Sequence, residues 1–330
     1  MKKKALIIIS SADKLPLKYP QGKSVSIGFF LVEMGKVLEV FKDEYEFTFA
    51  TTDGAIPTLD INGETLLMHT ANKLPVKSVE LTVKLNCKFD VDKYRENNAE
   101  YVNRRRKELE IAGELMGKLK VSKALPRSNK EAKIFKDEIQ EYMDTLKEHK
   151  FMSLKEIIEK DDDVNDEFKL SNFRFVHIPG GHAPMVDFVD NPYLGEVLNR
   201  IYENNILLSL ICHAPIALSS AKYRIDKNNN VINVDDHAYK GANITAFGKV
   251  EELQVALGGF YHVPGEKTRL EYYITDKLRD DGYIVSTTKE FLPKVIYDES
   301  KNLITGNGPQ AIDIQAKKLK EILEKRNLNM

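Results

Sequence analysis

Phe173-Arg-Phe-Val-His-Ile-Pro-Gly-Gly-His182 and, about thirty residues later, Leu207-Leu-Ser-Leu-Ile-Cys-His-Ala-Pro215 are the stretches that decide the fold. Each is an apolar run that ends in small or polar residues. This pattern is typical of a buried parallel strand whose last residues enter the crevice at the carboxyl edge of a sheet. The two stretches therefore predict neighbouring parallel strands with functional residues at their carboxyl ends.

The second stretch places a cysteine where a strand must turn into a helix. Cys212 follows the apolar run directly, and His213 is its neighbour. A thiol near a helix N-terminus experiences the helix dipole and free N–H groups, and both favour the thiolate. We therefore predict that Cys212 is a nucleophile with a lowered pKa, and that oxidants modify it before Cys87.

Three further features are expected at the same edge of the sheet. Gly180 and Gly181 offer backbone N–H groups with little steric bulk, as an oxyanion site requires, and His182 follows them. Glu33 lies on the apolar stripe of a helix predicted at residues 26–41, where poor solvation raises the pKa of a carboxyl group. We expect Glu33 to be protonated, to hydrogen-bond the Cys212 sulfur and to exchange a proton with the thiol or its substrate.

The beginning of the chain alternates strand and helix. A strand at residues 4–10, the helix at 26–41 and a strand at 45–51 follow one another as in a doubly wound α/β sheet. The pattern changes over residues 75–168, which are dense in Lys, Glu and Arg with apolar residues at helical spacing. That segment predicts a helical insertion or cap that supplies no strand to the sheet.

Composition limits the classes of partner. The chain has 330 residues and a net charge of -1, so nothing global indicates nucleic acid or an anionic membrane. Arg104-Arg-Arg106 is interpreted as a solvated helix face, and no apolar run reaches the roughly 18 residues of a membrane span. The two cysteines lie in different contexts, which favours free thiols in a reducing cytoplasm over a disulfide.

Taken together, these segments resemble the ThiJ/PfpI superfamily. The likeness is to the branch of heat-shock chaperones with glutathione-independent glyoxalase (glyoxalase III) activity. The matching pieces, in the family's order, are Gly28-Phe-Phe-Leu-Val-Glu33, Ile178-Pro-Gly-Gly-His182, Ile211-Cys-His-Ala-Pro215, Ile244-Thr-Ala-Phe247 and Leu303-Ile-Thr-Gly-Asn-Gly-Pro309.

The resemblance implies one flavodoxin-like α/β domain over residues 1–330, with a mostly parallel sheet sandwiched by helices and residues 75–168 as an insertion within it. It implies a nucleophile at Cys212, a base at His213 and a proton carrier at Glu33. Counted from Phe247, it places the acid of the triad at Glu252, with the neighbouring Glu251 as the alternative. The chain departs from the family pattern at two positions: Lys249 stands where bacterial members have Asp, and Ala214 stands where Gly is usual.

The implied activity is the cofactor-free conversion of methylglyoxal and related small dicarbonyls to hydroxy acids such as lactate, a lyase reaction of the D-lactate dehydratase type. The absence of G-x-G-x-x-G and G-x-x-x-x-G-K-[ST] from the sequence agrees with an enzyme that uses no nucleotide cofactor. We expect a cytoplasmic homodimer with no metal cofactor and with no nucleic-acid or membrane partner.

Other interpretations of the same site stay open. Cys212 suits a redox sensor or a holdase chaperone, and the Cys–His pair suits a peptidase, amidase or deglycase. A glutamine amidotransferase is disfavoured because neither His237 nor His262 begins a His-x-Glu sequence. Some relatives place the histidine that corresponds to His182 in a metal site, but spacing reveals no partners for it here. The other histidines carry no functional pattern; His177 is predicted to be structural, and His69 and His149 have no supporting context.

Overall fold

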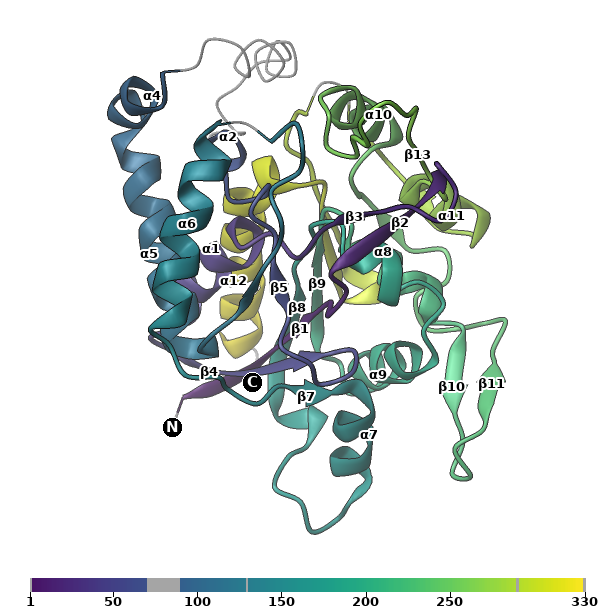
Figure 1. Cartoon of the computed structure of the whole chain (residues 1–330). Coiled ribbons are helices and arrows are strands. Elements are labelled where there is room, and N and C mark those ends of the chain that lie inside the picture. The colour runs from purple at the N-terminus through teal and green to yellow at the C-terminus, as the bar shows by residue number, and fades with distance from the viewer. Residues whose placement is uncertain (1, 70–89, 129, 289–290, 329–330) are drawn as a thin grey trace.

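The computed structural model describes residues 2–69, 90–128, 130–288 and 291–328. Its centre is a seven-stranded sheet in the order β15-β16-β9-β8-β1-β4-β7 (Figure 1). All neighbouring strands are parallel except β15 and β16. In that order the strands span Val295–Asp298, Leu303–Gly306, Leu207–Ile211, Phe173–Ile178, Lys3–Ile9, Tyr45–Thr51 and Met152–Ser153. The predicted doubly wound, mostly parallel sheet is confirmed.

The direction of winding reverses beside β1. From β1 the chain moves outward through β4 to β7, then returns to β8 on the other side of β1 and continues to β9 and β16. Sites in such sheets form outside the carboxyl ends of the strands where the order reverses. The segments that follow β1, β8 and β9 are therefore brought to one place.

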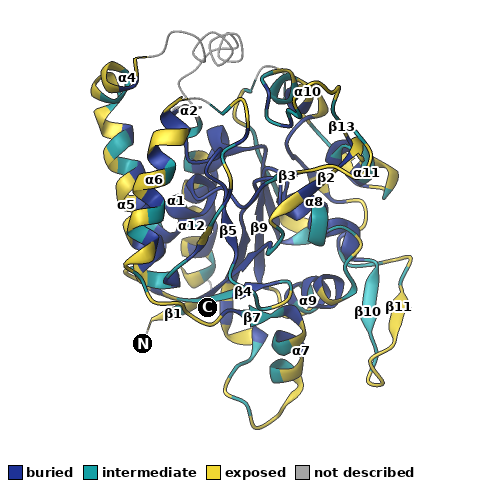
Figure 2. Ribbon diagram, in the orientation of Figure 1, coloured by how far each residue is buried: buried dark blue, intermediate teal, exposed yellow. Residues whose placement is uncertain are grey.

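Strand β1 shows why the sheet is buried on both faces. Alternate side chains of a strand point to opposite faces, so a strand covered on both sides must be apolar throughout. Ile7 and Ile9 join one core cluster, whereas Leu6 and Ile8 join the other. The strands at the centre of the molecule are buried accordingly (Figure 2).

Helices cover both faces of the sheet (Figure 1). On one face, α1 (Val32–Phe41) packs against α5 (Ala99–Met116) and α12 (Ile312–Leu328). On the other face, α9 (Pro192–Glu203) packs against α7 (Leu154–Asp162) and the 3₁₀ helix η2 (Ala214–Ser220). The remaining α-helices are α2 (Leu66–His69), α4 (Val91–Asn97), α6 (Lys130–Asp144), α8 (Pro184–Asp187), α10 (Lys249–Leu257) and α11 (Ile274–Asp280). Among the described residues, no helix is both long and apolar enough to cross a membrane.

Among the described residues, short strands form four smaller sheets around this core. They are β13 (Arg269–Leu270) with β2 (Lys14–Tyr19) and β3 (Ser24–Ser26); β10 (Tyr223–Ile225) with β11 (Val231–Asn233); β12 (Asn243–Ile244) with β14 (Ile284–Val285); and β5 (Thr58–Leu59) with β6 (Lys120–Val121). Three further 3₁₀ turns are η1 (Leu170–Asn172), η3 (Glu299–Lys301) and η4 (Pro309–Ala311).

The charged segment 75–168 differs from its prediction. Its first part, residues 75–89, lies outside the described residues, and the rest is largely helical as expected. However, β7 pairs with β4 at the edge of the central sheet, so the expectation that this segment supplies no strand is wrong. Helix α5 packs on α1, because its apolar stripe shares a core cluster with the sheet. That the segment is an insertion within one domain stays a prediction.

Helix α1 begins at Val32, six residues later than predicted from its periodicity. The preceding residues run extended against β5 instead: Phe29 donates to the Thr58 carbonyl over 2.9 Å and accepts from the Asp60 N–H over 2.9 Å. A Cβ at Gly28 would lie 2.1 Å from the Thr58 oxygen, so only glycine permits this approach. Tertiary pairing therefore overrides the helical pattern over these residues.

Candidate active site

Cys212 stands at a sharp turn between β9 and η2. Its φ angle is +62°, a left-handed conformation that costs free energy for a residue with a side chain. The turn is held on both sides, because the Cys212 N–H donates to Gly306 and its carbonyl accepts from Phe247, each over 2.9 Å. The strained backbone presents the thiol at the carboxyl edge of the sheet, as the sequence predicts.

His213 and Glu252 complete a triad with this thiol. The Cys212 Sγ lies 3.2 Å from His213 Nδ1, and His213 Nε2 lies 2.7 Å from Glu252 Oε2. The Phe247 ring stacks on the imidazole with centroids 5.0 Å apart. Because a carboxylate only accepts hydrogen bonds, His213 carries its proton on Nε2 and turns the Nδ1 lone pair to the thiol.

Burial sets the protonation of the histidine. Desolvation lowers the pKa of His213, so the ring is neutral and able to accept a proton at neutral pH. Desolvation acts in the opposite direction on Glu252, but its interactions with His213 and His182 outweigh it and hold its pKa well below the usual range. Glu252 is therefore the anionic member of the triad.

Glu33 reaches the cysteine from α1. Its Oε2 accepts hydrogen bonds from the N–H groups of Gly180 over 2.9 Å and Gly181 over 3.1 Å. A Cβ at Gly180 would lie 2.7 Å from the Cys212 Cβ and 2.8 Å from this carboxyl oxygen, so glycine is required between the two groups. The two N–H groups that the sequence suggests for an oxyanion site thus donate to Glu33 in this structure.

The carboxyl group of Glu33 is protonated at neutral pH. Complete burial raises its pKa from 4.5 to about 8, against the opposing hydrogen bonds from Cys212, Gly180 and Gly181. This agrees with the protonated Glu33 that its place on the apolar stripe predicts. His177 supports the start of the same helix, because its Nε2 lies 2.9 Å from the Glu33 carbonyl oxygen.

The expected low pKa of Cys212 is wrong. Burial raises the pKa of this thiol, and the neighbouring Glu33 carboxyl raises it further. The sequence argument relied on an α-helix dipole, whereas the turn leads into a seven-residue 3₁₀ helix and the sulfur is only 2% exposed. Cys212 is therefore a neutral thiol at rest, and its proton must leave through a neighbouring base.

Tyr261 and His182 surround the other oxygen of Glu252. The Tyr261 hydroxyl donates to Glu252 Oε1 and also hydrogen-bonds His182 Nε2, which lies 3.4 Å from the same oxygen. Sequence reasoning missed Tyr261, because a tyrosine nine residues beyond the acid carries no motif. Its pKa is raised by burial and by Glu252.

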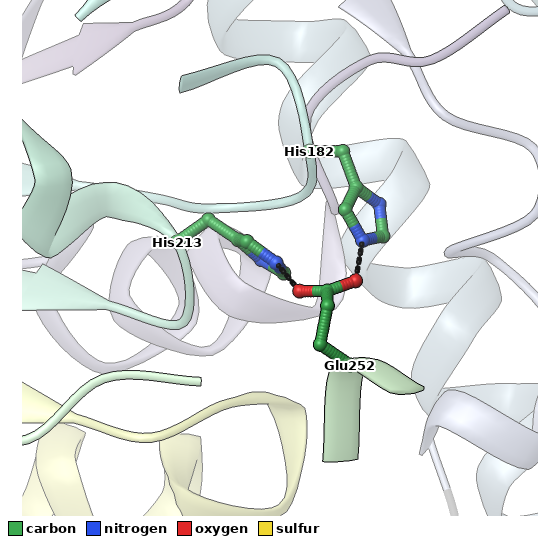
Figure 3. A group of neighbouring side chains, drawn as sticks. All are labelled: His182, His213 and Glu252. Atoms are coloured by element: carbon green, nitrogen blue, oxygen red, sulfur yellow. Dashed lines mark hydrogen bonds and ion pairs between the residues drawn. The ribbon is translucent and has the colours of Figure 1, made fainter. Parts of the chain in front are cut away.

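His182, His213 and Glu252 also form the one group of possible metal ligands found among the described residues (Figure 3). Their ligand atoms lie within 4.8 Å of one another, and all three side chains are buried. A cation bound through Nε2 of His213 would displace the proton from that nitrogen and break its hydrogen bond to Glu252. The donor set fits a metal, but the same atoms already satisfy one another as a triad and its support.

The other candidates lie apart from the reaction centre. Glu251 is buried on α10 with a pKa raised by desolvation, but the contact with His213 belongs to Glu252. Lys249, at the position where bacterial relatives have Asp, pairs with Asp276 over 2.5 Å. Ala214 is buried at the start of η2. Cys87 lies outside the described residues.

Comparison with known proteins accounts for this arrangement. A family model described as the DJ-1/PfpI family matches residues 136–251. Residues 136–251 therefore carry the match to a DJ-1/PfpI domain. The matched part contains β8, β9 and Cys212 with His213, and ends one residue before Glu252.

Curated relatives match part of the chain. A probable glutathione-independent glyoxalase, hsp3103 of Schizosaccharomyces pombe, is 28% identical over 163 residues, which are 48% of this chain and 56% of that protein. The protein/nucleic acid deglycase HchA of Staphylococcus aureus is 28% identical over 145 residues, 43% of each chain. The chain thus spans about half the length of the curated relatives it matches.

A solved structure shares the whole fold. Rapid Encystment Protein 24 KDa (REP24) of Francisella tularensis superimposes with a TM-score of 0.54, covering 98% of this chain and 99% of that one. At 16% sequence identity this likeness concerns the fold alone. It agrees with the flavodoxin-like sandwich that the resemblance of the sequence implies.

Proposed function

We propose that this DJ-1/PfpI chain is a glutathione-independent glyoxalase, which converts methylglyoxal and related small dicarbonyls to hydroxy acids. The observation that carries the proposal is the pairing of a buried Cys212–His213–Glu252 triad with a protonated carboxyl group at Glu33. A dicarbonyl needs a nucleophile for its aldehyde and a proton carrier for the adjacent carbons. The names of the two curated relatives support the same class of reaction.

The first step forms a bond between the Cys212 sulfur and the aldehyde carbon. The thiol proton passes to His213 Nδ1, 3.2 Å from the sulfur, and the aldehyde oxygen takes the proton of Glu33. The product is a neutral hemithioacetal beside an imidazolium and a carboxylate. Glu252 stabilises the imidazolium, because it stays ionised and accepts its Nε2–H.

The second step moves protons through Glu33 and His213, while an electron pair shifts from the first carbon to the second through the enediol. The Glu33 carboxylate removes the proton of the former aldehyde carbon, and the ketone oxygen takes the proton of His213, which gives an enediol. Glu33 then protonates the second carbon while the first oxygen returns its proton to His213, which gives a thioester. Water cleaves the carbon–sulfur bond: it supplies OH to the carbon and a proton to Glu33, while His213 reprotonates the sulfur. The balance is dicarbonyl plus water to hydroxy acid.

A deglycase is the second candidate, favoured by a specific cavity. A groove of about 1040 Å³ is lined by Glu252 and Tyr261 together with Leu253, Leu257 and Tyr273. That volume exceeds what a three-carbon dicarbonyl fills, so it suits a carbonyl adduct borne on a larger molecule. The same cysteine chemistry serves either substrate.

The test is lactate formation from methylglyoxal without glutathione. Wild type and Cys87→Ala should form lactate at equal rates, and Cys212→Ala should form none. Methylglyoxal-modified N-acetylarginine serves as the competing substrate for the deglycase. Lactate formation by Cys212→Ala at the wild-type rate would refute the role of the triad.

A further inference from the structure

The hydrogen bonds around Glu252 fix the tautomer of His182. Glu252 is ionised and can only accept hydrogen bonds, so the Tyr261 hydroxyl donates its single proton to Glu252 Oε1. The bond between the Tyr261 oxygen and His182 Nε2 must then be donated by the imidazole. His182 therefore carries a proton on Nε2. A second proton on Nδ1 would be a buried donor with no acceptor among the described residues, so Nδ1 holds a lone pair.

That lone pair is buried without a partner. His182 is 3% exposed, and its Nδ1 makes no hydrogen bond to any of the residues that the structure describes. The ring lies between Phe30 and Phe260, with centroids 5.9 and 5.8 Å away, and 4.3 Å from the ring of His213. Buried polar atoms without partners are rare in folded proteins, so an unpaired nitrogen beside the base of a triad points to a ligand.

We propose that His182 is a catalytic residue whose Nδ1 accepts a hydrogen bond from the hydroxyl group of the enediol intermediate; this rests on the proposed glyoxalase function. The carbonyl oxygens of a dicarbonyl only accept hydrogen bonds, so they cannot donate one to Nδ1. The hemithioacetal already bears a hydroxyl group on the former aldehyde oxygen, and the enediol adds a second on the former ketone oxygen. Nδ1 therefore gains this partner only when the ketone oxygen is protonated. An interaction present in the intermediate and absent in the substrate lowers the barrier instead of tightening substrate binding.

Tyr261 is a positioning residue in this arrangement. It touches His182 and Glu252, and its hydroxyl accepts the Nε2–H that keeps the lone pair on Nδ1. The two histidines are thereby arranged alike around one carboxylate. Each is held at its Nε2 end; the Nδ1 of His213 faces the thiol, and the Nδ1 of His182 has no partner among the described residues.

Two amide substitutions separate the two nitrogens of His182. His182→Asn keeps an acceptor near the place of Nδ1, whereas His182→Gln keeps a donor near the place of Nε2. We expect kcat for methylglyoxal to fall roughly 10- to 100-fold in His182→Gln with KM nearly unchanged, and clearly less in His182→Asn. His237→Asn is the matched control, because its Nδ1 also has no partner among the described residues and its ring packs on Tyr283, outside the site. A larger loss in His182→Asn, or an effect on KM alone, overturns the proposal.

A second measurement is independent of turnover. In protein labelled with ¹⁵N-histidine, the His182 resonances, assigned by their loss in His182→Gln, should show an unprotonated Nδ1 and a protonated Nε2 at neutral pH. A protonated Nδ1 overturns the proposal even if lactate is formed. If wild type forms no lactate, the proposed function fails, and hydroxyacetone, which carries a hydroxyl beside its carbonyl, becomes the probe. A shift of the Nδ1 resonance on its addition supports the acceptor role, and an unchanged resonance overturns it.

Discussion

Glu33→Gln should make the protein more stable and inactive at the same time. Burial raises the pKa of Glu33 from 4.5 to about 8, so the folded state holds a proton that the unfolded chain releases above pH 4.5. The stability contributed by this group is complete below pH 4.5 and is lost as the pH rises toward 8. Each pH unit within that window removes about 1.4 kcal/mol of unfolding free energy, or about 3 kcal/mol between pH 5.5 and 7.5.

Glutamine at position 33 removes this pH dependence of the unfolding free energy and preserves the local geometry. Its amide oxygen still accepts the N–H groups of Gly180 and Gly181, and it cannot ionise. The assay is urea unfolding of wild type and Glu33→Gln at pH 5.5, 6.5 and 7.5. The stability advantage of Glu33→Gln should grow by about 3 kcal/mol across this range, whereas lactate formation from methylglyoxal should be lost.

Glu39 is the matched control on the same helix. Hydrogen bonds from Lys107 and Lys36 outweigh its partial burial and hold its pKa at about 2, so it is ionised at every pH tested. The difference between wild type and Glu39→Gln should therefore be constant from pH 5.5 to 7.5. A constant difference for Glu33→Gln as well would refute the inference that Glu33 is protonated in the fold.

Three further predictions follow from the contacts of the site. The Glu33 carboxyl contributes to the raised pKa of Cys212, so Glu33→Gln should speed alkylation of Cys212 by iodoacetamide at pH 8.5. The rate is measured by mass spectrometry with Cys87 as the internal reference, and an equal or slower rate contradicts the prediction. Gly180→Ala should abolish activity and cost about 1–3 kcal/mol in urea unfolding, because its Cβ would meet Cys212 and Glu33; wild-type kinetics would show that the close approach is absent. Glu252→Gln should lower kcat at least 100-fold by weakening the support of the His213 imidazolium, whereas Glu251→Gln should keep activity; the opposite order would move the triad acid to Glu251.

Much of the site was predictable because its residues end apolar strands. The runs before Gly180 and Cys212 could only be buried parallel strands, and such strands deliver their ends to one edge. The turn at Cys212 and its contact with His213 follow from that placement. Glu252 needed the family resemblance, because it arrives on α10 from another part of the chain.

The features of the fold and the site that the sequence did not predict depend on contacts between distant segments. The extended path at Phe29 is set by pairing with β5, which no local periodicity encodes. The short strand β7 owes its place to the open edge of β4 and not to its own two residues. Tyr261 is brought to Glu252 by the turn after α10, and its role appears only once the hydrogen bonds of the carboxylate are counted.

The pKa of Cys212 was predicted wrongly for the same reason: it depends on contacts that the local sequence does not show. A sequence shows that Cys212 follows a strand, but the pKa of the sulfur depends on how deeply the turn is buried and on the acid beside it. A resting thiol and a resting carboxylic acid form a neutral pair, which a low-dielectric site holds at less cost than a thiolate and a carboxylate. In the proposed mechanism, charge develops only when substrate is present, on His213, next to the Glu252 carboxylate that is already ionised. Under that proposal, the deep burial of Cys212 delays its activation until an aldehyde is bound, which limits reaction of the thiol with other electrophiles.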